Sequence, residues 1–235
     1  MEKYFDATYI IEAIPMLLPF LKMTFLVAGL SVFFGTILGL ILAVMKLAKS
    51  KMAQKIAHGY TTVLRCTPSI VLLFLTYYGI PAIASNFGTN LNDVDTAVFV
   101  IITFSLQFGA LMSEVIRTAY QSIDRGQFEA AVSVGLSDLQ AYRRIILPQA
   151  VVVALPNFGN SLLELLKEGA LAYTIGLIDI MGKANLIIAG NYNAHALEIY
   201  IALSIIYWVL SIAIEQFFLK LEKVFSKGKQ VIKTT

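Results

Sequence analysis

The sequence predicts an all-α integral membrane protein with five transmembrane helices. Of its 235 residues, 58% are hydrophobic and only 14% are charged. A soluble domain of this length could not hide so much apolar surface in one core, whereas lipid tolerates an apolar exterior. Several apolar runs are long enough to cross a hydrocarbon core about 30 Å thick. The ten-residue alternation of outer-membrane strands is absent.

Five apolar runs are the expected spans: residues 23–45, 63–84, 97–116, 149–166 and 199–219. The first contains no charged residue and would form a helix roughly 34 Å long. The fourth is shorter, and Pro156 and Gly159 are expected to break it. The first run is expected to be retained, because the residues before it are acidic and a cleaved signal peptide begins with basic residues. Residues 1–235 are therefore expected to form one transmembrane domain.

Basic residues predict the orientation, because they gather in three of the segments that flank the spans. With five spans all three clusters lie on one face, which is then cytoplasmic, with the N-terminus outside and the C-terminus inside. A sixth crossing at residues 170–190 would separate the clusters, so this segment is expected to be re-entrant or to lie at the outer face, buried against protein. The clusters are Lys46, Lys49, Lys51, Lys55 and Arg65; Arg117, Arg125, Arg143 and Arg144; and Lys220, Lys223, Lys227, Lys229 and Lys233.

The loop 120–148 is too polar for the bilayer and too long for a simple turn. Residues 127–134 are a candidate helix that ends at Gly135. Ser137, followed by Gln140, has the spacing of a capping box that would start a second helix. That helix is expected to end at about Leu147, because proline disfavours the helical region for the preceding residue.

The motifs in this loop resemble the EAA loop of permeases from ABC importers. Glu129-Ala130-Ala131 is followed at the family's spacing by Gly135 and by Ile145, Leu147 and Pro148. The resemblance extends to the polar amino-acid subfamily through a second set of motifs. These are Arg65-Cys66-Thr67-Pro68, Tyr77-Tyr78-Gly79-Ile80-Pro81, Glu114, Arg117 and Gly126-Gln127. The resemblance implies a type I ABC importer permease in the cytoplasmic membrane that carries a polar amino acid.

One motif departs from the family pattern. The family reads Lys-Asp/Glu-Thr-Ser-Leu after the fourth span, whereas this chain has Lys167-Glu168-Gly169-Ala170-Leu171 and lacks both hydroxyls. The stretch 168–183 is similar to the cystine-transporting branch. L-cystine is therefore the specific substrate that the resemblance suggests.

The resemblance also implies partners. An ABC ATPase dimer would dock on the loop, a second permease subunit (identical or homologous) would complete the path, and an extracellular solute-binding protein would deliver the amino acid. Close approach of the ATPase is expected at Ala130 and Ala131, with Glu129 able to form an ion pair. The expected coupling residues are Gly126, Gln127, Glu129, Ala130, Ala131, Gly135 and Pro148.

No P-loop is present, since Gly176 to Lys183 has five intervening residues and Ala184 replaces the magnesium-binding hydroxyl. ATP and Mg²⁺ are therefore expected on the partner ATPase, and this chain is not expected to be an enzyme. One cysteine and two isolated histidines predict no metal site. The basic tail is expected to contact lipid headgroups, and no nucleic-acid site is expected.

Polar residues inside the spans are the candidate substrate path, because a charged residue there costs about 2.5–3.5 kcal/mol on insertion scales. Asn157, Asn160, Glu164 and Lys167 would share one helix face. Glu164 could bind the ammonium of an amino acid, and the other three its carboxylate. Gln107 and Thr67 complete the candidate set. In the alternative interpretation, the polar stripe joins helices structurally.

Other function classes predict features that the sequence does not show. A secondary transporter driven by an ion gradient, the main alternative, would be supported by internal repeats, and none is found. An intramembrane enzyme would need a nucleophile with a matching base, and no such pair falls in facing spans.

Overall fold

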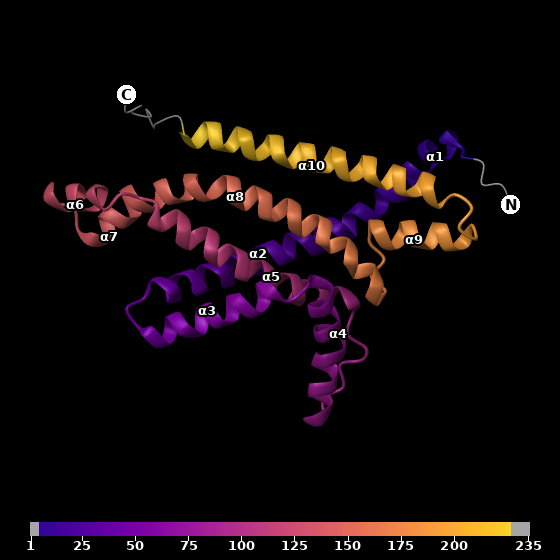
Figure 1. Cartoon of the computed structure of the whole chain (residues 1–235), viewed down its shortest axis with the longest axis horizontal. Coiled ribbons are helices and arrows are strands. Elements are labelled where there is room, and N and C mark those ends of the chain that lie inside the picture. The colour runs from indigo at the N-terminus through magenta and orange to yellow at the C-terminus, as the bar shows by residue number, and fades with distance from the viewer. Residues whose placement is uncertain (1–4, 227–235) are drawn as a thin grey trace.

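The computed structural model describes residues 5–226, and over that range every regular element is helical (Figure 1). Five helical stretches are long and apolar enough to cross a membrane, which confirms the predicted fold class. They are Ala7–Leu47, Ser69–Asn86, Thr96–Gln121, Asp138–Ile175 and Ala196–Phe225. The basic residues Lys227, Lys229 and Lys233 of the third predicted cluster lie outside the described residues.

The first span is longer than predicted, because a helix precedes the apolar run. Helix α1 (Ala7–Leu17) leads through a 3₁₀ turn (Leu18–Phe20) into α2 (Leu21–Leu47) without a break. The turn holds a proline in its first positions, where the missing N–H costs nothing. Asp6 caps α1 by accepting a hydrogen bond of 2.9 Å from the N–H of Thr8.

The second predicted span, residues 63–84, is not one helix. Helix α3 (Lys51–Cys66) ends before Thr67, and α4 (Ser69–Asn86) begins after Pro68. Pro68 drives Thr67 into an extended conformation, with φ −92° and ψ 128°. Helix α4 projects away from the other long helices as a result (Figure 1).

The third span, α5 (Thr96–Gln121), leads into the polar loop, whose first half is as predicted. Helix α6 (Arg125–Ser133) ends before Gly135, which has φ +91°. The capping box between Ser137 and Gln140 starts α7 (Asp138–Ala141).

The second half of the loop differs from the prediction, because the helix does not end at Leu147. A π-helical turn (Tyr142–Ile146) joins α7 to α8 (Leu147–Glu168). Within this turn the N–H of Leu147 bonds the carbonyl of Tyr142, five residues back, so that Pro148 enters a helix that is already widened.

The prediction that Pro156 and Gly159 break the fourth span is also wrong, since α8 continues through both residues. Gly159 has a packing role instead. A Cβ atom there would lie 2.9 Å from the ring of Phe218 on α10 (Ala196–Ser226).

Residues 170–190 form a short, partly buried element whose buried face packs against protein, in agreement with that part of the expectation. A 3₁₀ turn (Gly169–Ile175) leads to α9 (Ile180–Gly190), whose first turn is capped by the buried Asp179. Its 11 residues extend about 16 Å, too short to cross the bilayer. The buried side chains Ile180, Ala184 and Ile188 belong to a cluster shared with α1 and α10. Helix α9 lies at the end of the molecule opposite α6 and α7 (Figure 1).

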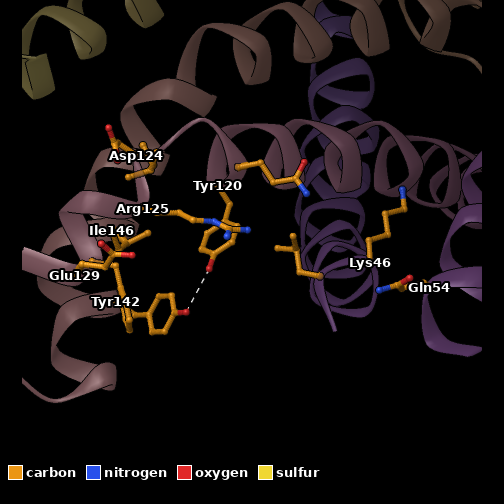
Figure 2. Close-up of a pocket in the computed structure, with 12 residues that line it drawn as sticks. Lys46, Gln54, Tyr120, Asp124, Arg125, Glu129, Tyr142 and Ile146 are labelled. Carbon is orange, nitrogen blue, oxygen red and sulfur yellow. Dashed lines mark hydrogen bonds between the residues drawn. The ribbon is translucent and has the colours of Figure 1, made fainter. Parts of the chain in front are cut away.

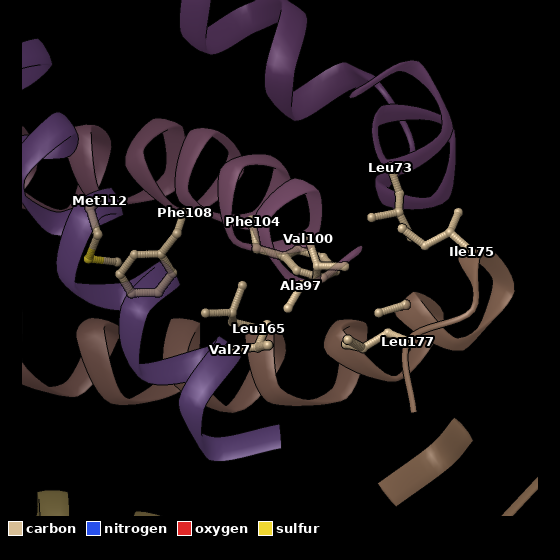
Figure 3. Close-up of a cluster of buried hydrophobic side chains, with 11 residues drawn as sticks. Val27, Leu73, Ala97, Val100, Phe104, Phe108, Met112, Leu165, Ile175 and Leu177 are labelled. Carbon is tan, nitrogen blue, oxygen red and sulfur yellow. The ribbon is translucent and has the colours of Figure 1, made fainter. Parts of the chain in front are cut away.

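The centre of the molecule is the contact between α2 and α5. Glycines let the two backbones approach, as small residues do between membrane helices. A Cβ at Gly39 would lie 2.6 Å from the Cβ of Met112, and one at Gly35 would lie 2.9 Å from the Cβ of Phe108. Phe104, Phe108 and Met112 of α5 belong to one buried cluster with Val27 of α2 and Leu165 of α8 (Figure 3).

This contact predicts that Gly39→Ala destabilises the protein, because the added methyl group overlaps Met112. Overpacking a core lowers the free energy of unfolding by about 1–3 kcal/mol. Thermal unfolding of the detergent-purified chain measures the effect. Gly29→Ala is the matched control on the same helix, since no atom lies within 4 Å of its Cβ position. Equal midpoints for the two variants would contradict the close approach.

Candidate functional site

A polar cleft opens at the break between α3 and α4, where α5 and α8 face it. Its volume is about 470 Å³, within the range of small-molecule sites. The cleft brings together three of the predicted substrate-path residues, Thr67, Gln107 and Glu164. Its lining is Arg65, Cys66, Thr67, Pro68, Ser69, Gln107, Leu111, Glu164 and Glu168.

Gln107 and Ser69 are buried polar residues of this cleft. The amide nitrogen of Gln107 donates to Ser69 Oγ at 2.6 Å, and Ser69 Oγ in turn donates to Glu168 Oε2 at 2.8 Å. The carbonyl oxygen of Gln107 is buried and accepts no hydrogen bond within the described residues. Because an unpaired buried acceptor costs about 1–3 kcal/mol, this oxygen is well suited to a donor group of a ligand.

Charged groups of both signs surround Gln107. Glu164 and Glu168 supply carboxylates from α8, and Arg65 supplies a guanidinium from the last turn of α3. Carboxylates can bind ammonium groups, and a guanidinium can hold a carboxylate through two parallel hydrogen bonds. The cleft therefore has the chemistry to bind a zwitterion.

Sequence reasoning did not assign Arg65, Ser69 and Glu168 to the path. Arg65 begins the motif Arg65-Cys66-Thr67-Pro68, Ser69 follows it, and Glu168 belongs to the motif Lys167-Glu168-Gly169-Ala170-Leu171. Only the fold brings these two segments together.

The predicted polar stripe on α8 lies on one open face. Asn157, Asn160, Glu164 and Lys167 are all exposed, and none makes a hydrogen bond or ion pair within residues 5–226. The stripe thus does not join helices inside this chain. Only Glu164 reaches the cleft, and the other three lie along the face beyond it.

The loop between α5 and α8 presents most of the predicted coupling residues to solvent. Gly126, Gln127, Glu129, Ala130, Gly135 and Pro148 are exposed. Ala131 is an exception, because it is 6% exposed and packs inside the loop, so only Ala130 offers a small contact surface. Two apolar side chains that the sequence analysis missed are exposed instead, Val134 at 80% and Leu139 at 77%. Val134 directly precedes Gly135, and Leu139 lies within the capping box of Ser137 and Gln140, so both adjoin features that the sequence predicts.

A groove of about 720 Å³ separates the loop from the ends of α2 and α3. Figure 2 shows Asp124, Arg125 and Glu129 on the loop side, with Lys46 and Gln54 on the other. An open groove with charges of both signs suits a protein surface better than an apolar ligand.

Three aromatic residues tie the loop to α5 at this groove. The hydroxyl of Tyr120, in the last turn of α5, donates to the hydroxyl of Tyr142 at 3.4 Å (Figure 2). The ring of Phe128 on α6 lies 5.0 Å from that of Tyr142, centroid to centroid. The loop is therefore fastened to the end of a membrane span.

Comparison with known proteins agrees with this architecture. Residues 35–226 match the family described as "Binding-protein-dependent transport system inner membrane component". The chain is 40% identical over 234 residues to the "L-cystine transport system permease protein TcyL" of Bacillus subtilis (strain 168), covering 100% of this chain and 97% of that protein. It is 39% identical to the "Probable amino-acid ABC transporter permease protein PatM" of Vibrio harveyi, over 87% of this chain and 89% of that one.

Solved structures show the same fold. A chain of an amino acid ABC transporter crystallised with histidines superposes with a TM-score of 0.81 and 31% identity, covering 94% of this chain and 99% of that chain. A chain of the MetNI methionine ABC transporter shares the fold at a TM-score of 0.67 and 18% identity, over 89% of this chain and 96% of that one.

These relatives are permease subunits, not enzymes or gradient-driven carriers. Permeases of this kind work with ATPase subunits, a further permease subunit and a substrate-binding protein. The five apolar helices, the polar loop and the matched family together show that this chain belongs to the binding-protein-dependent transport system inner membrane components, as the multi-pass permease subunit of an amino-acid ABC importer.

Proposed function

We propose that this permease carries L-cystine and that the cleft at the α3–α4 break is part of its path. The observation that carries the proposal is the buried carbonyl of Gln107, which is unpaired within the described residues and belongs to a cleft that Thr67 and Glu164 also line. The relative whose name specifies L-cystine transport supports the choice of substrate.

The chemistry of L-cystine suits this lining. The molecule has two ammonium and two carboxylate groups, and the cleft offers two glutamates and one arginine. Glu164 and Glu168 would bind ammonium groups, Arg65 a carboxylate, and the Gln107 carbonyl a further N–H donor. Asn157, Asn160 and Lys167 would continue the polar path along the open face of α8.

The loop and its groove would be the docking surface of an ABC ATPase dimer, which binds ATP and Mg²⁺. Val134, Leu139 and Ala130 would meet the ATPase, Glu129 would pair with one of its basic residues, and the remaining predicted coupling residues, Gly126, Gln127, Gly135 and Pro148, would shape the docked loop. A second permease subunit would cover the open face of α8.

The proposed orientation puts the loop and the C-terminus in the cytoplasm and the N-terminus outside, where a solute-binding protein would dock. Basic residues support it, because Arg125, Arg143 and Arg144 in the loop lie at the same end of the molecule as the turn between α2 and α3, which holds Lys49 (Figure 1).

Glu164→Gln tests the cleft. Loss of the carboxylate removes one charge-assisted hydrogen bond to an ammonium group, which contributes about 1.5–3 kcal/mol. The apparent affinity for L-cystine should therefore fall about 10- to 150-fold. It is measured from the uptake of labelled L-cystine by cells that express the full transporter. Glu215→Gln, an exposed glutamate far along α10, is the matched control and should leave uptake unchanged. Normal uptake by an assembled Glu164→Gln transporter would remove Glu164 from the path.

Leu139→Ser tests the docking surface. If Leu139 is buried on docking, its loss costs about 1.5–3 kcal/mol of association free energy. Co-purification of the ATPase with the permease in detergent should therefore fall by one order of magnitude or more. Phe87→Ser is the control, because Phe87 is as exposed (82%) but follows α4, far from the loop. Undiminished ATPase recovery with Leu139→Ser would argue against this docking surface.

A further inference from the structure

A buried ionic network joins the end of α2 to α5. The side chain of Lys46, in the last turn of α2, has no exposed surface, and its Nζ donates to Glu114 Oε1 at 2.7 Å and to Ser113 Oγ at 2.8 Å. In the described part of the chain, no other side-chain hydrogen bond joins α2 to α5. A buried ammonium group is tolerated only when it is paired in this way.

Glu114 extends the network along α5. Its second oxygen accepts from Arg117 Nε at 2.8 Å and from Arg117 Nη2 at 2.6 Å, and Arg117 Nη1 donates to Gln121 at 2.6 Å. One carboxylate thus holds a cation from each side. In the sequence, Glu114 and Arg117 are family motif positions, and Arg117 and Lys46 belong to the basic clusters that predict orientation.

The network ends at the proposed ATPase groove. Lys46 and Gln121 both line the groove, opposite Arg125 and Glu129 of the loop (Figure 2). Tyr120, next to Gln121, is the residue through which the loop contacts α5, by way of Tyr142. A displacement of the loop would therefore reach α5 through Tyr120 and Tyr142, and would reach the end of α2 through Lys46.

We infer that Lys46, Glu114 and Arg117 form a positioning joint that makes the end of α2 follow the coupling loop when the ATPase moves it. This inference deepens the proposed function and rests on its ATPase docking surface. The joint is not required to hold the two helices together, because the glycine contacts at Gly35 and Gly39 already do so closer to the bilayer centre. It sets which part of the membrane domain moves with the loop.

The test reconstitutes the complete transporter in liposomes and measures L-cystine uptake and ATP hydrolysis in the same sample. Lys46→Met should lower the uptake per ATP hydrolysed about 2- to 30-fold, the range seen when coupling networks are altered, while ATPase activity persists. Lys49→Met, an exposed neighbour, is the matched control, and Lys46→Arg keeps the charge and should retain coupling. A purely structural role predicts that uptake and hydrolysis fall together, with their ratio unchanged, and that result would overturn the inference.

A double variant guards against misfolding and tests the pair as a unit. Lys46→Met with Glu114→Gln removes both charges of the Lys46–Glu114 pair, so neither partner is left charged and buried alone. Arg117 loses its carboxylate partner in this variant, but its side chain is 25% exposed and keeps its hydrogen bond to Gln121. If the two residues act together, the double variant should couple no worse than Lys46→Met alone. Additive losses would contradict a shared joint.

A readout that does not depend on the substrate separates this inference from the proposed function. Spin labels at Arg143→Cys and Lys49→Cys, two exposed positions outside the proposed docking residues, in a Cys66→Ala background, report the distance between the loop and the end of α2. With the joint intact, the distribution of distances between the two labels should stay narrow when Mg-ATP is added to the ATPase complex. With Lys46→Met, this distribution should broaden or shift. Identical distributions would overturn the inference, whereas failure of the parent to bind an ATPase or to transport L-cystine would count against the proposed function.

Discussion

The close approach of α2 and α5 is the constraint on which the rest of the molecule depends. Gly35 and Gly39 remove the side chains that would otherwise hold the two backbones apart, and Phe108 and Met112 fill the space. Membrane helices gain little from the hydrophobic effect against each other, so such close packing is a main source of their association. It also brings Lys46 within 2.7 Å of Glu114.

Helix α5 connects the two candidate sites because it carries residues of both. Gln107 faces the cleft and Tyr120 faces the groove, and Tyr120 lies 13 positions after Gln107, roughly 20 Å further along a continuous helix. A rigid helix fastened at one end to the loop and at the other to the cleft can transmit a displacement without a change of secondary structure. The proposed positioning joint would add α2 to the same moving unit.

Prolines show where local rules were sufficient and where they failed. Pro68 ends α3 as the rule for the preceding residue requires, since Thr67 is extended. Pro148 and Pro156 do not end a helix. At Pro148 the π-helical turn has already displaced the hydrogen bonds, and neighbouring helices hold α8 in place beyond it. A local rule contains no information about such compensation.

The sequence by itself determined the helical class, the number of apolar spans, the loop with its capping box and glycine stop, and the family, because hydropathy, turn chemistry and motif spacing are local properties of the chain. It also predicted that Asn157, Asn160, Glu164 and Lys167 share a face, which follows from helical periodicity alone. Only the tertiary structure decided that Thr67, Gln107 and Glu164 meet in one cleft, that Ala131 faces inward, and that Lys46 pairs with Glu114. Those relations depend on how distant helices pack, and packing is set by the shapes of many side chains at once.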